Sequence, residues 1–242
     1  MNLRIMTYNI QHGRIYRTEP ELIDLRGAGD AIKRLGADII GLNEVRGPGE
    51  RGDYTAQTGF LAGYTGFHSF FGRSIYVGGM NPYGNAVLSR FPIVSAEIIR
   101  IPDPALPSGN RLEPRTVTRA EIEIPDGGHF RRIAVFTSHF GLNSVEKEHA
   151  VSTAASLMRD EKLPFVFMGD FNMTPDDPLL APLSVYADSN ADIIGGKLSF
   201  PSINPTKRID YIYTSPDIRV LGADIPDEHQ SDHRPVVMDT EL

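Results

Sequence analysis

The sequence predicts an α/β protein in which two β-sheets pack together and helices cover their outer sides. Two observations lead to this class. A strand, a helix and a second strand follow one another at the start of the chain, and the same order returns in the second half. Of the 242 residues, 40% are hydrophobic, and no low-complexity linker or short-period repeat interrupts them. We therefore expect a single domain over residues 1–242.

The first strand–helix–strand unit occupies the first 45 residues. Residues 3–9 form an apolar run typical of a buried strand, and residues 38–45 form a second one. Between them, a helical pattern ends at Gly36, a residue type that commonly stops helices. Its apolar face consists of Leu25, Ala28, Ile32 and Leu35. This order of elements predicts a crossover unit.

The middle of the chain predicts mostly strands and loops. The stretch 46–82 is rich in glycine and aromatic residues, and we expect loops, one short helix and a strand near residues 67–71. A proline-rich loop is expected over 102–114. Further strands are expected at 86–89, 93–101, 116–124 and 132–140. In the alternating stretch 116–124 the core-facing residues are Ala120, Ile122 and Ile124.

The second strand–helix–strand unit contains the clearest helical pattern. Apolar residues line one face of residues 145–158, and Asn143 and Glu146 have the spacing of a capping box at its start. The apolar run 164–167 then predicts a buried strand that leads to Asp170. Three more strands are expected near the end of the chain, at 208–213, 218–223 and 235–240.

The charge and the lack of cysteine exclude some functions. The formal net charge is −7, and no run of Lys and Arg exceeds two residues. This argues against non-specific binding to long nucleic acid, which usually needs a basic face. A phosphate substrate stays open, because a bound metal ion can supply positive charge. With no cysteine, the chain has no disulfide, no thiolate zinc site and no Cys nucleophile.

The sequence shows neither a signal-peptide pattern nor an apolar run long enough to span a membrane. We therefore expect a cytoplasmic protein without a transmembrane segment, or a secreted one if a signal peptide has been removed. The oligomeric state is not indicated.

Polar residues at the ends of the apolar strands predict a functional site. They are Asn9, Glu44, His139, Asp170, Asn172, Asp210, Asp232 and His233. Strand ends that converge on one edge of a sheet sandwich are a common place for such a site. Side chains at i and i+2 of a strand point to the same side, so we expect Asp170 and Asn172 to face one pocket and Phe171 to turn the other way.

Glu44 emerges from an apolar strand and is a candidate metal ligand. A carboxylate with oxygen-rich neighbours suits a hard cation. Because the chain has no cysteine and no His pair at zinc spacing, the sequence favours Mg²⁺ or Mn²⁺ over zinc. The alternative is a structural carboxylate at the rim that pairs with Arg46.

Asp232 and His233 are adjacent, so both can reach one site only from a turn. Asp210 is then a candidate to orient His233, because a carboxylate on one imidazole nitrogen fixes the tautomer and favours the charged ring. The structural alternatives are a polar turn before the last strand and a pair between Asp210 and Arg208. Each of these motifs is weak evidence for a functional site on its own, but their joint order along the chain is stronger evidence.

That order resembles the endonuclease/exonuclease/phosphatase superfamily, which includes deoxyribonuclease-like nucleases, abasic-site endonucleases, inositol polyphosphate phosphatases and sphingomyelinases. The resemblance covers nearly the whole chain, and Gly-Asp-Phe-Asn followed by a downstream Ser-Asp-His is a specific combination. The matching stretches are residues 7–10, 43–45, 83–90, 137–140, 169–172, 208–211 and 231–235.

The resemblance implies a four-layer α/β/β/α sandwich of two mixed, mainly antiparallel sheets with helices outside. It also implies a metal-dependent phosphoesterase. Glu44 would be the principal ligand of Mg²⁺ or Mn²⁺, helped by Asn9 and Asp232.

The catalytic roles are implied by the same resemblance. Asp170 would orient or deprotonate the attacking water, and Asn172 would hold a phosphate oxygen. His233, oriented by Asp210, would contact the scissile phosphate and stabilise the charge that develops. His139 would be a second phosphate contact or an acid.

Three further positions match the family less closely. Arg115 resembles the arginine that many members place near the phosphate. Asn85 can be purely structural. Asn43 departs from the pattern, since many relatives have Gln before the metal-binding Glu, and its shorter side chain can shift a contact behind the ligand.

Three functions follow from the resemblance and the composition. The first is a phosphodiesterase or phosphatase for a small or lipid-linked substrate, which the acidic chain favours. The second is a DNA or RNA endonuclease or exonuclease, and the third is a non-catalytic binding module of the same fold. We expect residues 46–82 and 102–114 to set specificity. The aromatic residues of the first stretch either pack a satellite core or form a wall for an apolar substrate: Phe60, Tyr64, Phe67, Phe70, Phe71 and Tyr76.

Overall fold

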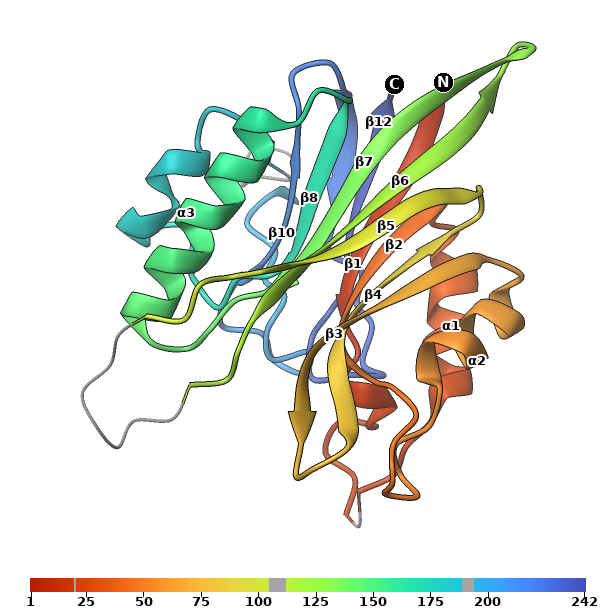
Figure 1. Ribbon diagram of the computed structural model, residues 1–242, viewed down its shortest axis with the longest axis vertical. Helices are drawn as coiled ribbons and strands as arrows, with labels where there is room; N and C mark the ends of the chain where they lie inside the picture. Colours follow the sequence, from red (N-terminus) through yellow and green to blue (C-terminus); the bar gives the residue numbers. More distant parts are fainter. Residues whose placement is uncertain (20, 105–111, 189–193) are drawn as a thin grey trace.

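The computed structural model describes residues 1–19, 21–104, 112–188 and 194–242. Within these residues the strands form two six-stranded sheets, and helices lie on the outer sides of both (Figure 1). The expected four-layer α/β/β/α sandwich is therefore confirmed. Most of the predicted proline-rich loop, residues 105–111, lies outside the described residues.

Each sheet is mixed but mainly antiparallel. Across the first sheet the strands are β11 (Arg219–Asp224), β12 (Val236–Glu241), β1 (Asn2–Asn9), β2 (Ile39–Arg46), β4 (Asn81–Ser89) and β3 (His68–Val77). Across the second they are β5 (Ile93–Arg100), β6 (Thr116–Asp126), β7 (His129–His139), β8 (Phe165–Asp170), β10 (Asp210–Thr214) and β9 (Ala187–Asp188). Among these described strands, the parallel pairs are β1 with β2 and β7 with β8.

Three apolar layers hold the sandwich together. Leu3 and Ile5 of the first sheet pack with Ile122 and Val135 of the second to form the central core between the sheets. Two outer cores bury the opposite faces of the sheets against helices. Burial of apolar surface on both faces explains why the central strands are nearly continuous apolar runs.

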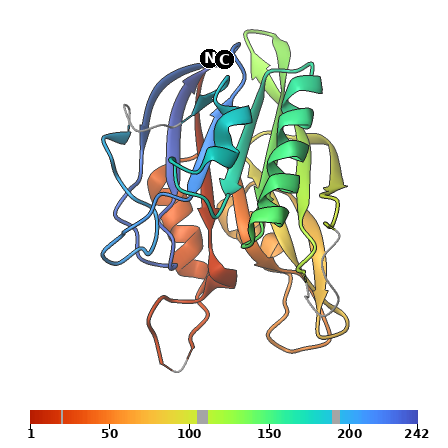
Figure 2. The same ribbon diagram turned by 90° about the vertical axis from the view of Figure 1, so that its left-hand side faces the viewer.

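Helix α1 (Leu25–Leu35) has the predicted end, α3 (Ser144–Asp160) extends slightly beyond the predicted residues 145–158, and α2 (Gln57–Thr65) is the short helix expected within 46–82. On the first sheet lie α1 and α2, and Gly36 ends α1 with a left-handed φ of 67°. On the second sheet lies α3, which Figure 2 shows in front of its sheet. The predicted capping box of Asn143 and Glu146 is present. No described helix is long and apolar enough to cross a membrane.

The strand boundaries differ from the prediction in the glycine-rich region. The strand expected at 67–71 extends over His68–Val77, and its partner begins at Asn81 rather than at residue 86. The two pair antiparallel as one long hairpin, whose turn contains Gly78 and Gly79. Cross-strand hydrogen bonding therefore overrides the weak local strand propensity of these residues.

The two crossover units place their polar strand ends together. Helix α1 connects the parallel pair β1 and β2, and α3 connects the parallel pair β7 and β8. Because parallel strands end at the same edge, Asn9 lies beside Asn43 and His139 lies beside Asp170. The two sheets present these ends on the same side of the sandwich, which positions the site.

Candidate active site

The strand ends of both sheets surround one cleft of about 570 Å³. Six of the predicted site residues line it: Glu44, His139, Asp170, Asn172, Asp232 and His233. Asn9 and Asp210 are buried directly behind them. Arg115 is not among the lining residues, and its guanidinium pairs with Glu113 at 3.2 Å.

Glu44 reaches the cleft through an irregularity of its strand. The pairing of β2 with β4 shifts register between Leu42 and Val45, and Glu44 has a φ of 59°. Tyr83 donates a hydrogen bond to its Oε2 at 2.7 Å, and Asn9 donates to its Oε1 at 3.0 Å. Burial works to raise the pKa of Glu44, but the nearby imidazoles and these two hydrogen bonds hold it below its usual range.

The structural alternative for Glu44 was a pair with Arg46. Arg46 instead pairs with Asp53, with 3.1 Å between Nη1 and Oδ2. Arg46 therefore does not neutralise the Glu44 carboxylate, which lines the cleft.

Asp170 is the last residue of β8, so one expectation about it is wrong. The strand ends there and Asn172 lies beyond it, in a left-handed conformation with a φ of 53°. The i, i+2 rule of strands does not apply, yet both side chains reach the cleft. The Asn172 N–H turns back and donates to Asp170 Oδ1 at 2.9 Å, which closes a tight turn at the strand end.

The backbone directly before Asp170 passes so close to the neighbouring strand that residue 169 must be glycine. Gly169 has a φ of 145°, and a Cβ atom there would lie 1.8 Å from the carbonyl oxygen of Ser138 on the neighbouring strand. Only glycine fits this contact, which explains the Gly-Asp order of the motif.

Asp170 accepts several hydrogen bonds and lies near two imidazoles. Asn9 donates to its Oδ2 at 3.1 Å. The same oxygen lies 3.4 Å from His139 Nε2 and 3.5 Å from His233 Nε2. Burial raises the pKa of Asp170 to about 7, although the charge of His233 opposes this. A carboxyl group that titrates near neutrality suits a general base.

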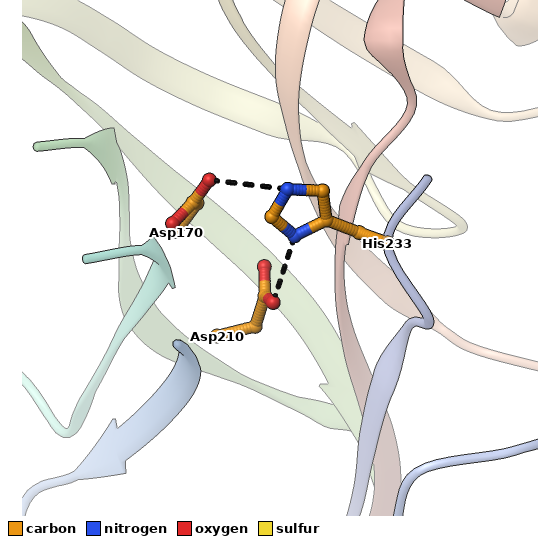
Figure 3. A group of neighbouring side chains, drawn as sticks. All are labelled: Asp170, Asp210 and His233. Atoms are coloured by element: carbon orange, nitrogen blue, oxygen red, sulfur yellow. Dashed lines mark hydrogen bonds and ion pairs between the residues drawn. The ribbon is translucent and has the colours of Figure 1, made fainter. Parts of the chain in front are cut away.

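Asp210, His233 and Asp170 form a line of alternating charge, shown in Figure 3. His233 Nδ1 lies 2.9 Å from Asp210 Oδ2, and its Nε2 faces Asp170. Burial works to lower the pKa of His233, but the two carboxylates raise it to about 10. Asp210 therefore keeps the imidazole charged and oriented, and Phe200 packs on the ring with 4.8 Å between centroids.

His139 has the opposite electrostatic state. Burial and the charge of Arg115 lower its pKa to about 3, so the ring is neutral in neutral solution. Its Nε2 lies 3.1 Å from Asn172 Nδ2, where the neutral ring can accept a hydrogen bond. A neutral ring favours a hydrogen-bonding contact over the acid role.

The donor set around Glu44 fits a hard divalent cation. Burial raises the pKa of Asp232, and the charge of Glu44 adds to this effect. With Asp170, three carboxylates meet here, and the positive charge of His233 offsets one of them. Their oxygen atoms match the preference of Mg²⁺ or Mn²⁺.

Asn9 has a different orientation from that expected of a ligand. Its Nδ2 donates to Glu44 and Asp170, while its Oδ1 accepts from the Gln11 N–H at 3.1 Å. In this conformation Asn9 orients the two carboxylates and does not present its oxygen to a cation.

A second group of residues in the site also has the side-chain types that bind metal ions. Asp170, Asp210 and His233 lie within metal-ligand distance of one another. His233 has no free lone pair when it is protonated, and both its nitrogens already face carboxylates. With His233 protonated, this group is therefore poorly suited to hold a cation.

Sequence reasoning missed several residues around the cleft. Lys147, from the first turns of α3, and Lys207, just before β10, both line it, as does Phe200. Tyr83, which holds Glu44, lies inside the recognised stretch 83–90 but has no apolar pattern to mark it. The sequence signal that could have identified the two lysines is their closeness to motif residues, since Lys207 directly precedes Arg208.

Asn43 and Asn85 join the two sheets behind the site. Asn43 Oδ1 accepts from the backbone N–H of Asp170 at 3.0 Å, and Asn43 Nδ2 donates to Asn85 Oδ1 at 2.8 Å. Asn85 Nδ2 in turn donates to the carbonyl of Thr116 at 3.3 Å. The shorter amide at residue 43 thus spans from β2 to β8, and Asn85 has the structural role.

We expect Asn43→Ala to weaken both the fold and turnover. It leaves two buried polar groups without partners, which lowers the free energy of unfolding by about 2–4 kcal/mol. At this chain length the melting temperature should fall by roughly 5–15 °C. Because the Asp170 backbone loses its anchor, kcat should fall about tenfold or more. Thermal melts and steady-state kinetics measure both, and Asn2→Ala, at an exposed end of β1, is the control. An unchanged melting temperature would contradict the proposed bridge.

The aromatic residues of 46–82 do not form a wall of this cleft, since none of the six lines it. Phe67 and Phe71 pack against the outer core of the first sheet, and Phe60 stacks on Tyr64. Tyr64 also donates to Asp30 of α1. The satellite-core interpretation therefore accounts for Phe67 and Phe71, whereas Phe60 is 40% exposed.

The fold and the cleft define a hydrolase of the phosphoesterase class. The profile of the Endonuclease/Exonuclease/phosphatase family matches residues 6–233, so the chain belongs to this family. Its members are hydrolytic phosphoesterases that generally depend on divalent metal ions, and this chain is an enzyme of that class.

Solved structures share the fold at low sequence identity. An endonuclease/exonuclease/phosphatase from Beutenbergia cavernae has a TM-score of 0.76 and 23% identity, covering 100% of this chain and 72% of its own. A mannosyl-6-phosphatase from Bacteroides thetaiotaomicron has a TM-score of 0.74 and 19% identity, covering 99% and 100%. The human Nocturnin catalytic domain with bound sulfate has a TM-score of 0.70 and 18% identity, covering 99% and 94%. A comparison with curated protein sequences finds no match.

Proposed function

We propose that the protein is a Mg²⁺- or Mn²⁺-dependent phosphodiesterase or phosphatase that hydrolyses a small or lipid-linked phosphate ester. The observation that carries this proposal is the charged line Asp210–His233–Asp170 beside the Glu44 and Asp232 carboxylates, all in one cleft. Because both sheets contribute side chains to this cleft, we also infer that residues 1–242 act as one domain.

Asp170 has the position and the proton affinity of the general base. Its carboxylate takes a proton from water, the water oxygen forms a bond to phosphorus, and the ester P–O bond breaks, with its electron pair going to the leaving oxygen, which takes up a proton. A positioned base contributes about 10²- to 10⁴-fold in rate. Asn9 and the Asn172 N–H keep the carboxylate in one orientation.

His233 and Asn172 face the phosphate oxygens in this mechanism. His233 stays charged because Asp210 and Asp170 flank it, so it can stabilise negative charge as it develops. Asn172 Nδ2 donates to Phe140 O and His139 Nε2, both at 3.1 Å, and a phosphate oxygen would replace the imidazole nitrogen as acceptor. The neutral His139 would supply a second contact, and Arg115 would act through its charge at longer range.

Glu44 and Asp232 would hold the divalent ion. When bound there, the ion neutralises charge on the phosphate oxygens. Asn9 would keep Glu44 in place from behind.

The second candidate, a DNA or RNA nuclease, is favoured only by family membership. The net charge of −7 weighs against a long polyanionic substrate, and among the described residues that line the cleft the lysines and arginines are only Lys147 and Lys207. A small substrate needs far fewer phosphate contacts.

An activity panel tests the proposal. We expect turnover of bis-p-nitrophenyl phosphate, an inositol phosphate or a sphingomyelin-type lipid in Mg²⁺ or Mn²⁺, with loss of at least about 100-fold in EDTA because the carboxylates then lack their counter-charge. Supercoiled plasmid and an abasic-site duplex are the comparison substrates. Nicking or abasic-site cleavage that EDTA stops would favour the nuclease instead. Turnover that survives EDTA would contradict the metal role of Glu44 and Asp232.

A further inference from the structure

The cleft contains two lysines that the mechanism above does not use. Lys147 comes from α3 and Lys207 from the segment that leads into β10, and both line the cleft. Within the described part of the chain, neither ammonium group forms an ion pair or a side-chain hydrogen bond. Arg46 and Arg115, by contrast, lie in ion pairs with Asp53 and Glu113.

Charge is separated across the cleft. Glu44 and Asp232 come from strands and loops of the first sheet, whereas the two lysines come from elements of the second sheet. Asp177 also lines the second side, but its carboxylate accepts the N–H of Leu179 at 3.0 Å as a helix cap. Asp177 keeps its charge but forms no ion pair with either lysine within the described residues, so both ammonium groups are open to a ligand.

One phosphate does not need these lysines. In the proposed mechanism the reacting phosphate would already be served by the charged His233, the Asn172 amide and the cation that Glu44 and Asp232 would hold. Lys147 and Lys207 are two further cationic groups in the same cleft, neither of them in an ion pair within the described residues, and an anion of the ligand is a suitable partner for them.

Apolar residues also line the cleft. Leu142, Met173, Phe200 and Ile209 line the cleft, and Leu142 is 72% exposed. A carbon chain or ring can lie across these residues, with an anion at each end. Two lysines suffice for one such anion but not for the repeated phosphates of a long nucleic acid.

We infer that the substrate is a small phosphate ester with a second anionic group, such as a second phosphate, which Lys147 and Lys207 bind while the first phosphate reacts. This inference rests on the proposed function and names the substrate class of the same site.

Binding of α,ω-alkanediol bisphosphates tests it. Ethane, propane and hexane members of this series differ in the spacing of their two phosphates, and each has a monophosphate counterpart. Their inhibition constants are measured against bis-p-nitrophenyl phosphate hydrolysis in saturating Mg²⁺. We expect at least one bisphosphate to bind about tenfold or more tightly than its monophosphate, since a charged hydrogen bond is typically worth that factor.

Variants of Lys147 and Lys207 test whether these two residues bind the second anion. Lys147→Met and Lys207→Met should each remove about tenfold of the bisphosphate affinity, and both together should abolish the preference over the monophosphate. The control is Lys162→Met, which makes the same change at an exposed lysine outside the cleft and should leave the preference intact. Equal affinity of every bisphosphate and its monophosphate for the wild type would overturn the inference, as would a preference that survives in the double variant.

Calorimetry separates this inference from the proposed function. Titration of the same ligands into the Mg²⁺-loaded protein measures binding without turnover. If the protein hydrolyses no ester of the panel, the proposed hydrolysis is wrong, and calorimetry still decides whether the lysines select a second anion. If it hydrolyses the aryl diester but shows no bisphosphate preference, the inference alone is wrong.

Discussion

Asp170→Asn should lower kcat by about 10²- to 10⁴-fold, the contribution of a positioned general base, while the protein remains folded. The amide has the same shape, and its Oδ1 can still accept the Asn172 N–H. It has no affinity for a proton near pH 7, in contrast to the Asp170 carboxyl, whose pKa burial raises to about 7. Steady-state kinetics on the best substrate of the panel measure the loss.

The controls for this variant separate chemistry from folding. Asp160→Asn makes the same change at a side chain that is 70% exposed, and its kcat should match that of the wild type. A thermal melt should show that Asp170→Asn still folds, because Asp210 continues to pair with His233 in this variant. Near-wild-type turnover in Asp170→Asn would show that another group deprotonates the water.

Glu44→Gln should weaken Mg²⁺ or Mn²⁺ binding by at least about 100-fold, since changes one shell further out already cost 10- to 100-fold. Gln keeps the size of the side chain but removes its charge, and its amide nitrogen would face either the Tyr83 hydroxyl or the Asn9 amide, which both act as donors. Isothermal titration of the ion measures the change directly, without any substrate.

The metal-free state of this variant provides a second test. Glu44 adds negative charge beside Asp232 and raises its pKa, so removal of that charge should not destabilise the ion-free protein strongly. Glu50→Gln, at an exposed position after β2, is the matched control and should bind the ion as the wild type does. Unchanged ion affinity in Glu44→Gln would move the metal site away from Glu44.

Local patterns were sufficient for the elements that carry their own signals. The capping box of Asn143 and Glu146 begins α3, and Gly36 ends α1, because both features depend only on neighbouring residues. The alternating stretch with Ala120, Ile122 and Ile124 is buried as predicted, since side-chain period alone places those residues on one face. The length of the hairpin that begins at His68 was underestimated, because pairing with the long second strand stabilises it.

The site shows the same division. The order of the motifs along the chain identified four candidate site residues, and the fold places all of them around one cleft: Glu44, Asp170, Asp232 and His233. Their roles within the cleft depend on contacts between distant segments. Asn172 reaches the site from a left-handed turn and not from a strand, because the N–H of Asn172 bonds to Asp170.

By itself the sequence determined the family, the fold class and the polar residues of the strand ends, because these follow from local patterns and from the order of motifs along the chain. The tertiary structure alone decided the charge states and orientations: a charged His233, a neutral His139, and an Asn9 that orients carboxylates. It also brought Lys147 and Lys207, 60 positions apart in the numbering, to one side of the cleft. Burial and neighbouring charges set these properties, and both arise only when segments far apart in the sequence pack together.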